Sequence, residues 1–312
     1  MARLTLAFRS PGENFDKWQA AFAALMPDLS FVHWRDVSDP GAVDAVMCWL
    51  PPEGWLASFP KLRLVQSLGA GVDHVLKDGR YPAHVPLVRL VDPAMTRAMT
   101  DFVTFQVMRL HLGEPTYRRQ QQVGLWEPHV PLRTVDRRVG ILGLGELGTA
   151  TAAALVRIGF DVAGWSRTPK DLPQVTCFSG EAGFAPFLAR SDILVCLLPL
   201  TSATEGILSA ATFAQMPQGA GLINVGRGGH LVEADLLAAL DSGQLSEAVL
   251  DVFQTEPLPE AHPFWTHSRI VVTPHVAAVT NPATASLVVA DNLRRLQAGE
   301  GWPDRVDLAS GY

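Results

Sequence analysis

Short apolar runs alternate with longer amphipathic ones along most of this chain. Continuous apolar runs are typical of strands buried in a parallel sheet, and a 3.6-residue period is typical of the helices between them. The pattern predicts strands at 3–8, 44–49, 64–67, 86–90, 138–142, 161–165, 192–197, 220–224, 248–251 and 270–273. It predicts helices at 13–26, 94–112, 146–158, 182–189, 232–241 and 283–297. This alternation indicates an α/β fold with parallel sheets covered by helices on both faces.

Segment 113–137 departs from the pattern, because it is polar, aromatic and poorly periodic. We interpret it as a linker, or as an arm that packs on another subunit. The whole chain of 312 residues is too long for one ordinary domain and about right for two.

Composition and charge exclude several classes of protein. Hydrophobic residues make up 48% of the chain and charged residues 18%, which excludes a disordered chain. The formal net charge of −6 gives no basic footprint for nucleic acid. No stretch of 18 or more apolar residues occurs, so we predict no membrane span. Cys48, Cys177 and Cys196 are odd in number and lack zinc spacing, which predicts no metal site and a cytoplasmic location.

A glycine-rich loop, GLGELG at 143–148, follows an apolar strand and opens a helical run. In that context Gly143 permits the tight turn, Gly145 lets a cofactor pyrophosphate approach the backbone, and Gly148 lets the helix pack on the strand. Glu146 and Leu147 stand at the helix N-terminus, whose free N–H groups would face the phosphates. A plain tight turn and a methyltransferase loop are the alternatives.

The next predicted strand ends without the acidic residue that usually binds the adenosine ribose of NAD. It ends instead in Ser166, Arg167 and Thr168, followed by Lys170. These side chains can bind a 2′-phosphate, so the sequence predicts NADPH over NAD(H), although NAD(H) remains possible. The alternative is that Arg167 and Lys170 are solvated surface cations.

Three later predicted strands each end close to a reactive side chain: Arg227, Asp251 with Glu256, and His275. In open α/β sheets such groups converge beyond the carboxyl ends of the strands. Arg227 can bind a carboxylate and a carbonyl oxygen, His275 can act as a general acid, and Glu256 can hold the other imidazole nitrogen. The set suits reduction of a 2-keto acid. Taken singly, each of these residues also fits an ordinary surface or loop role.

The motifs GLGELG (143–148), LPLTSAT (198–204), NVGRG (224–228), DVFQTEP (251–257) and TPH (273–275) resemble the D-isomer-specific 2-hydroxyacid dehydrogenases. The resemblance covers nearly the whole chain. It is strongest to the glyoxylate/hydroxypyruvate reductase A branch, through WSRTPKDLP (165–173), SLGAGVDH (67–74) and the C-terminal VDLASGY. The chain departs from the family in the missing acid after the second strand and in VAAVT after His275, where many relatives carry a glycine.

The resemblance implies roles for particular residues. Arg227, Glu256 and His275 would be catalytic, and Asp251 would touch the nicotinamide carboxamide or order the residues around it. Further cofactor-binding positions would be Leu198, Pro199, Thr204, Val225 and Gly226. The substrate would meet Arg227, the backbone of Ala70 and Gly71, and Trp49, for which a core or interdomain position is the alternative.

The resemblance also implies two doubly wound Rossmann-like domains with a cleft between them. The substrate domain, flavodoxin-like, would comprise 1–97 and 284–312, and the dinucleotide-binding domain 98–283. The expected protein is a homodimer that reduces small 2-keto acids, such as glyoxylate and hydroxypyruvate, with NADPH. Two alternatives stay open: an NAD-dependent D-2-hydroxyacid dehydrogenase for a larger 2-keto acid, and a nucleotide-sensing scaffold or corepressor.

Overall fold

The computed structural model describes residues 3–312, which form two compact units. Unit 1 combines the chain up to Met95 with Thr280–Tyr312, and unit 2 is Thr96–Val279. Unit 2 is therefore an insertion in the sequence of unit 1. The boundaries predicted from the sequence, 97/98 and 283/284, lie within a few residues of those in the structure.

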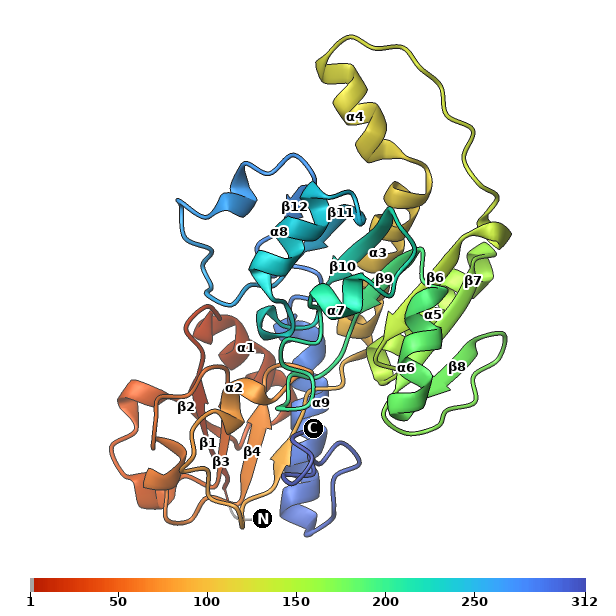
Figure 1. Ribbon diagram of the computed structural model, residues 1–312. Helices are drawn as coiled ribbons and strands as arrows, with labels where there is room; N and C mark the ends of the chain where they lie inside the picture. Colours follow the sequence, from red (N-terminus) through yellow and green to blue (C-terminus); the bar gives the residue numbers. More distant parts are fainter. Residues whose placement is uncertain (1–2) are drawn as a thin grey trace. The chain divides into compact units, whose positions relative to one another are not determined.

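Unit 1 contains a five-stranded parallel sheet (Figure 1). Its strands are β1 (Thr5–Arg9), β2 (Ser30–His33), β3 (Ala45–Cys48), β4 (Leu64–Ser67) and β5 (Leu87–Val88), in the order β2-β1-β3-β4-β5. Its helices are α1 (Phe15–Leu25), α2 (Asp73–Leu76) and α9 (Pro282–Ala298), with short 3-10 turns at Trp34–Asp36, Pro40–Ala42 and Leu56–Ser58. This strand order is that of flavodoxin-like doubly wound folds.

The two ends of the chain meet inside unit 1, because α9 packs against α1. The buried Asn292 of α9 donates a hydrogen bond to Gln66 of β4 over 2.8 Å. Asn281 caps the start of α9 by accepting the N–H of Ala283, and Gly299 ends the helix in the left-handed conformation. Unit 1 is therefore complete only with its C-terminal segment.

Unit 2 contains a seven-stranded parallel sheet in the order β12-β11-β10-β9-β6-β7-β8. The strands are β6 (Arg138–Leu142), β7 (Asp161–Ser166), β8 (Thr176–Ser179), β9 (Ile193–Cys196), β10 (Ala220–Asn224), β11 (Leu245–Leu250) and β12 (Ile270–Val272). Counted from β6, this is the 3-2-1-4-5-6 order of dinucleotide-binding folds with one further strand. The order reverses between β6 and β9, which is the point where such folds bind ligands.

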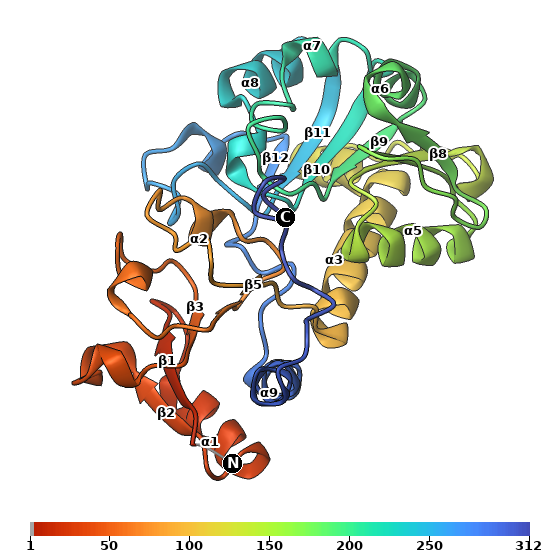
Figure 2. The same ribbon diagram turned by 90° about the horizontal axis from the view of Figure 1, so that it is seen from below.

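Helices cover both faces of the unit 2 sheet (Figure 2). They are α3 (Pro93–His111), α4 (Glu114–Gln122), α5 (Glu146–Ile158), α6 (Gly180–Ala189), α7 (Ala210–Phe213) and α8 (Glu233–Asp241), with 3-10 turns at Thr134–Asp136, Gly228–His230 and Pro263–Trp265. Val103 of α3 and Leu155 of α5 belong to the core on one face, and Phe187 of α6 and Leu236 of α8 to the core on the other. Burial on both faces explains why these strands have continuous apolar sequences.

The structure adds elements that the sequence pattern did not predict. Two short strands, β2 and β8, lie at sheet edges, and β11 begins at Leu245, three residues earlier than expected. The segment 113–137 is not a plain linker, since its first part forms α4. Figure 1 shows α4 and the extended stretch after it standing away from the rest of unit 2. Within residues 3–312, every helix is too short or too polar to span a bilayer.

Candidate active site

The glycine loop connects β6 to α5 at the point where the strand order reverses. Gly143 has a φ of +102°, and a Cβ there would lie 2.8 Å from the carbonyl oxygen of Leu197, in the backbone that follows β9. A Cβ on Gly148 would lie only 1.8 Å from the carbonyl oxygen of Gly143. Packing inside the protein therefore accounts for both glycines.

Gly145 differs from its two neighbours in the motif. It stands at the N-cap of α5 with φ −79° and ψ −162°, which any residue can adopt, and a Cβ there would meet no protein atom within 4 Å. Open space at this position fits a phosphate that approaches the backbone. The N–H groups of the first turn, which includes Glu146 and Leu147, have no partners within the helix and carry its positive dipole end. The loop therefore suits the pyrophosphate of a dinucleotide.

The end of β7 presents cationic side chains to solvent. Arg167, Thr168 and Lys170 are exposed. The hydroxyl of the buried Ser166 donates to the carbonyl of Thr168 over 2.8 Å, so Ser166 shapes this turn. Asp161, at the other end of β7, pairs with Arg190 over 2.6 Å. A carboxylate at that end does not replace the missing ribose-binding acid.

Arg227 lies in a loop that leaves β10 and packs closely on the loop that leaves β11. A Cβ on Gly228 would lie 1.9 Å from the carbonyl carbon of Phe253, so only glycine fits there. The side chain of Asn224 supports the loop from inside, donating to the carbonyl of Arg227 and accepting the N–H of Gly226. This packing brings the NVGRG and DVFQTEP motifs together.

Asp251, buried at the end of β11, holds the turn that carries His275. Its carboxylate accepts hydrogen bonds from the Thr273 hydroxyl at 2.6 Å and from the N–H groups of Val276 and Ala277 at 2.9 and 3.0 Å. His275 has a φ of +54°, a conformation that costs a non-glycine residue about 1–3 kcal/mol. Asp251 therefore offsets that strain, which favours the ordering role among the two that the resemblance implied.

His275 and Glu256 form a hydrogen-bonded pair, with 2.8 Å between Nδ1 of the imidazole and Oε2 of the carboxylate. The other oxygen of Glu256 accepts the N–H of Phe253. Partial burial opposes ionisation of Glu256, but these hydrogen bonds and the charges of His275 and Arg227 outweigh it and hold the pKa of Glu256 below its usual range. Because Nδ1 faces the carboxylate, Nε2 is directed away from it for proton exchange.

The loop after β9 contains three predicted cofactor positions, Leu198, Pro199 and Thr204. The Thr204 hydroxyl donates to the carbonyl of Pro199 over 2.7 Å and accepts the N–H of Thr201. Leu198 is buried.

The structure thus places the predicted residues of unit 2 at the carboxyl ends of β6, β7, β9, β10, β11 and β12. Because these strands are parallel, those ends lie along one edge of the sheet.

In unit 1, the turn after β4 contains Ala70 and Gly71. The buried Ser67 organises it, accepting the N–H of Gly69 and lying within hydrogen-bonding distance of His74 Nε2, at 3.2 Å. Within residues 3–312, the structure contains no hydrogen bond donated by the amides of Ala70 and Gly71. Two free N–H groups in one turn suit an anion.

Trp49 packs on this turn, with its ring centroid 3.9 Å from that of His74. A Cβ on Gly69 would lie 2.7 Å from the indole, which explains the glycine. Sequence reasoning named the segment but missed its two buried polar side chains, Ser67 and His74. It also missed His230, whose contacts are described below. Ser67 and His74 lie at the two ends of the SLGAGVDH motif, and His230 lies two residues after the NVGRG motif. No known spacing of residues in these motifs predicts their hydrogen-bond partners.

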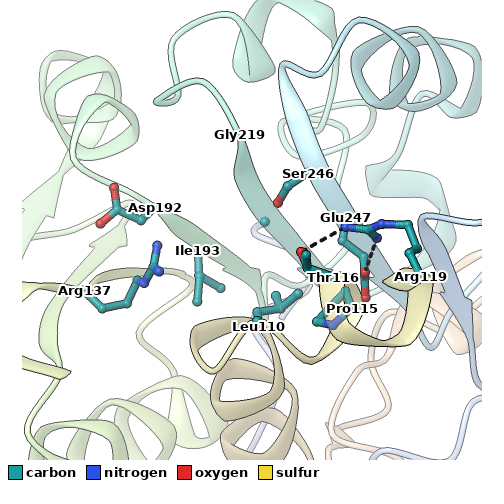
Figure 3. A pocket seen from close by; sticks show the side chains of 12 residues that line it. Leu110, Pro115, Thr116, Arg119, Arg137, Asp192, Ile193, Gly219, Ser246 and Glu247 are labelled. Atoms are coloured by element: carbon teal, nitrogen blue, oxygen red, sulfur yellow. Dashed lines mark hydrogen bonds and ion pairs between the residues drawn. The ribbon is translucent and has the colours of Figure 1, made fainter. Parts of the chain in front are cut away.

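A separate pocket lies at the opposite edge of the unit 2 sheet (Figure 3). It is lined by α4, the end of α3 and the amino ends of β9, β10 and β11; Figure 3 shows Arg119 directed toward Thr116 and Glu247. Of the site residues predicted from sequence, none lines this pocket. The predicted site residues of unit 2 therefore lie away from this pocket, at the carboxyl edge of the sheet.

The fold order, the glycine loop and the Arg227, Glu256 and His275 set define a nucleotide-dependent dehydrogenase. A family model described as "D-isomer specific 2-hydroxyacid dehydrogenase, NAD binding domain" matches residues 105–277. The chain belongs to this family.

Full-length relatives agree with that assignment. Glyoxylate/hydroxypyruvate reductase A of Yersinia enterocolitica is 40% identical over 99% of this chain and 100% of its own length. Two solved structures match over their full length, and each match covers 100% of this chain and 100% of the solved chain. One is a D-isomer specific 2-hydroxyacid dehydrogenase from Xanthobacter autotrophicus in complex with NADPH and MES (TM-score 0.95, 44% identity). The other is the NADPH-dependent glyoxylate/hydroxypyruvate reductase from Sinorhizobium meliloti in complex with NADP and sulfate (TM-score 0.93, 35% identity).

Proposed function

We propose that this protein reduces small 2-keto acids, such as glyoxylate and hydroxypyruvate, to 2-hydroxy acids with NADPH. The observation that carries the proposal is the His275–Glu256 pair, held at the same sheet edge as Arg227 and the glycine loop. The names of the relatives from Yersinia enterocolitica and Sinorhizobium meliloti support the same activity. Bound NADPH would supply the hydride to the keto carbon.

In this mechanism the side chains bind the substrate and move one proton. Nε2 of His275 donates a proton to the carbonyl oxygen as the alkoxide develops. Ionised Glu256 accepts the Nδ1–H, which orients the ring and favours the protonated imidazole. The Arg227 guanidinium binds the substrate carboxylate and stabilises charge on the carbonyl oxygen. In unit 1, the N–H groups of Ala70 and Gly71, with Trp49 beside them, would contribute to binding a substrate carboxylate.

The test is an assay of NADPH consumption with a panel of 2-keto acids. Replacing His275 by Ala should lower kcat by about 10²–10⁴-fold, as expected for a lost acid–base group, with NADPH binding retained. His262 provides the control, because it also pairs with a glutamate, Glu233 at 3.3 Å from its Nε2, but lies outside the proposed set. Near wild-type turnover by His275→Ala refutes the proton-donor role. Tight NADPH binding without turnover of any keto acid favours the scaffold.

We further propose that Arg167 binds the 2′-phosphate, with help from Thr168 and Lys170. Their exposure just after β7, whose last residue is Ser166 rather than a carboxylate, supports this assignment. Wild-type protein should use NADPH with a higher kcat/KM than NADH, and Arg167→Ala should remove most of the difference. The control is Arg157→Ala, which changes a cation at the last turn of α5, the end of that helix far from the glycine loop. Equal use of both cofactors by the wild type contradicts the assignment.

We propose a homodimer formed through α4 and the stretch that follows it. Trp126 and Val130 are 96% and 97% exposed, which is unusual for side chains of this size and type. A second copy would cover them. Trp126→Glu combined with Val130→Glu should lower the sedimentation coefficient to that of a monomer, whereas Trp265→Glu should not. A wild-type protein that sediments as a monomer refutes this proposal.

The compartment is part of the same proposal. All three cysteines are free thiols, which supports a reducing cytoplasmic environment.

A further inference from the structure

His230 lies completely buried between two loops of unit 2, with 0% of its surface exposed. Its Nδ1 accepts the backbone N–H of Arg227 over 3.0 Å. On the other side of the ring, its Nε2 lies 3.2 Å from the carbonyl oxygen of Pro199. An N–H can only donate and a carbonyl can only accept, so both contacts are satisfied by the neutral ring with its proton on Nε2.

The two backbone groups belong to loops with different proposed roles. Arg227, in the loop after β10, provides the guanidinium for the substrate. Pro199 belongs to the loop after β9, which also contains the cofactor position Thr204. The carbonyl of Pro199 also accepts the Thr204 hydroxyl, so one oxygen joins His230 to that loop. Backbone hydrogen bonds from Gly206 to Gly229 and from Leu208 to His230 run alongside.

The ring also lies against the proposed cofactor surface. A Cβ on Gly226 would be 2.9 Å from Nδ1 of His230, so the imidazole packs directly on the NVGRG backbone. Any movement of the ring would therefore displace the backbone on either side of it.

We propose that His230 is a positioning residue that couples the cofactor loop after β9 to the Arg227 loop after β10. It touches neither the substrate nor the reacting atoms. Its Nδ1 sets the backbone of Arg227, and its Nε2 sets the carbonyl of Pro199. This inference rests on the proposed function, because that function assigns the substrate to Arg227 and NADPH to the loop after β9. The cofactor positions Val225 and Gly226, which lie in the same loop as Arg227, have their N–H groups held by Cys196 and Asn224 rather than by His230.

Two substitutions separate the halves of this coupling. The amide of Asn reaches the place of Nδ1, and the longer amide of Gln reaches the place of Nε2. His230→Asn should keep the keto-acid KM and kcat within about threefold of wild type and raise the Kd for NADPH about tenfold. His230→Gln should do the reverse, leaving the NADPH Kd within about threefold and lowering kcat/KM for the keto acid about tenfold. Tenfold is the scale of one unsatisfied buried backbone group.

His262 offers a matched control, since its Nδ1 accepts the N–H of Phe264 and its Nε2 lies 3.3 Å from Glu233. His262→Asn and His262→Gln should lower Tm without affecting the NADPH Kd and the keto-acid kcat/KM to different extents. If the His230 variants change only Tm, or change both parameters equally, the coupling is refuted.

The wild-type protein provides a test that does not depend on whether the variants fold. Nitrogen NMR of labelled histidine should show His230 at neutral pH as the neutral Nε2–H tautomer. A protonated ring or the Nδ1–H tautomer overturns the assignment. A wild type that binds NADPH but reduces no keto acid refutes the proposed function instead, and the NADPH Kd of His230→Asn still tests the Pro199 contact.

Discussion

Replacing Gly145 by Ala should weaken NADPH binding and leave the stability of the fold almost unchanged. Replacing Gly148 by Ala should destabilise the fold. The contrast follows from what each new Cβ would meet. At Gly145 there is no protein atom within 4 Å, while at Gly148 the carbonyl oxygen of Gly143 is 1.8 Å away. The first position has room that we assign to the pyrophosphate, and the second has none.

The magnitudes follow from the same geometry. Ala at Gly145 suits φ −79° and ψ −162°, and the loss of freedom in the unfolded chain stabilises by about 0.4–1 kcal/mol. Ala is a poorer N-cap than Gly by a similar amount, so the net change should be within about 0.5 kcal/mol. At Gly148 the helix or the loop must move by more than about 1 Å, and strain of this kind costs about 1–3 kcal/mol or more.

The effect on the cofactor should be larger at Gly145. A methyl group that keeps the pyrophosphate from one amide removes a hydrogen bond to a charged group, worth about 1.5–3 kcal/mol, so the Kd for NADPH should rise at least about tenfold.

Thermal unfolding without ligand and fluorescence titration with NADPH measure the two quantities separately. Gly148→Ala should lower Tm by about 2–4 °C per kcal/mol for a unit of this size. Gly145→Ala should leave Tm without ligand within about 2 °C of wild type. A tenfold higher Kd should reduce the stabilisation that excess NADPH confers by about 1.4 kcal/mol relative to wild type. A Gly145→Ala protein that binds NADPH like wild type refutes the assignment of that space to the cofactor. A Gly148→Ala protein with unchanged Tm refutes the packing argument.

Three further predictions concern charge and order at the site. The depressed pKa of Glu256 means that its contribution to stability is fully present above the ordinary glutamate pKa of about 4.3 and is lost as pH falls through the lower pKa of the folded protein. Unfolding of wild type and Glu256→Gln across pH 3–6 measures this difference, and a constant difference across that range refutes it. Asp251→Asn should lower kcat more than it raises the NADPH Kd, because it loosens the turn that holds His275. His74→Asn, which removes the contact to Ser67, should raise the keto-acid KM several-fold with the NADPH Kd unchanged.

Most of the fold was predictable because both sheets are parallel and buried on both faces. Such strands have uninterrupted apolar sequences, as in the ILVC run of β9. The missed strands are short and lie at edges: β2 is SFVH, with every residue half-buried, and β8 is TCFS. α4 was missed because EPTYRRQQQ has no apolar stripe, and its Arg118–Glu114 ion pair and Pro at the first turn are weak signals in a sequence.

The site was predictable where a residue follows a strand, and not where it acts through the backbone of another loop. Arg227 and His275 could be located because they follow β10 and β12 by a few residues. His74 bonds to the N–H of Leu50, 24 residues away, and His230 to the carbonyl of Pro199, 31 residues away. The separation of such partners depends on the length of the intervening elements, which no local pattern records.

Unit 1 also imposes an order on biosynthesis. Its first residues leave the ribosome long before α9. In the folded unit, Asn292 of α9 donates a hydrogen bond to Gln66 of β4, and the carbonyl of Leu296 accepts one from Arg63, just before β4. At about 5–20 residues per second, the N-terminal strands wait roughly 10–40 s for that helix, while all of unit 2 is made and free to fold. During this interval the surfaces of α1 and β4 that α9 later contacts remain uncovered. A nascent chain of this protein should therefore depend on chaperones most for its beginning, and a truncation just before α9 should be recovered as aggregate with an intact nucleotide unit.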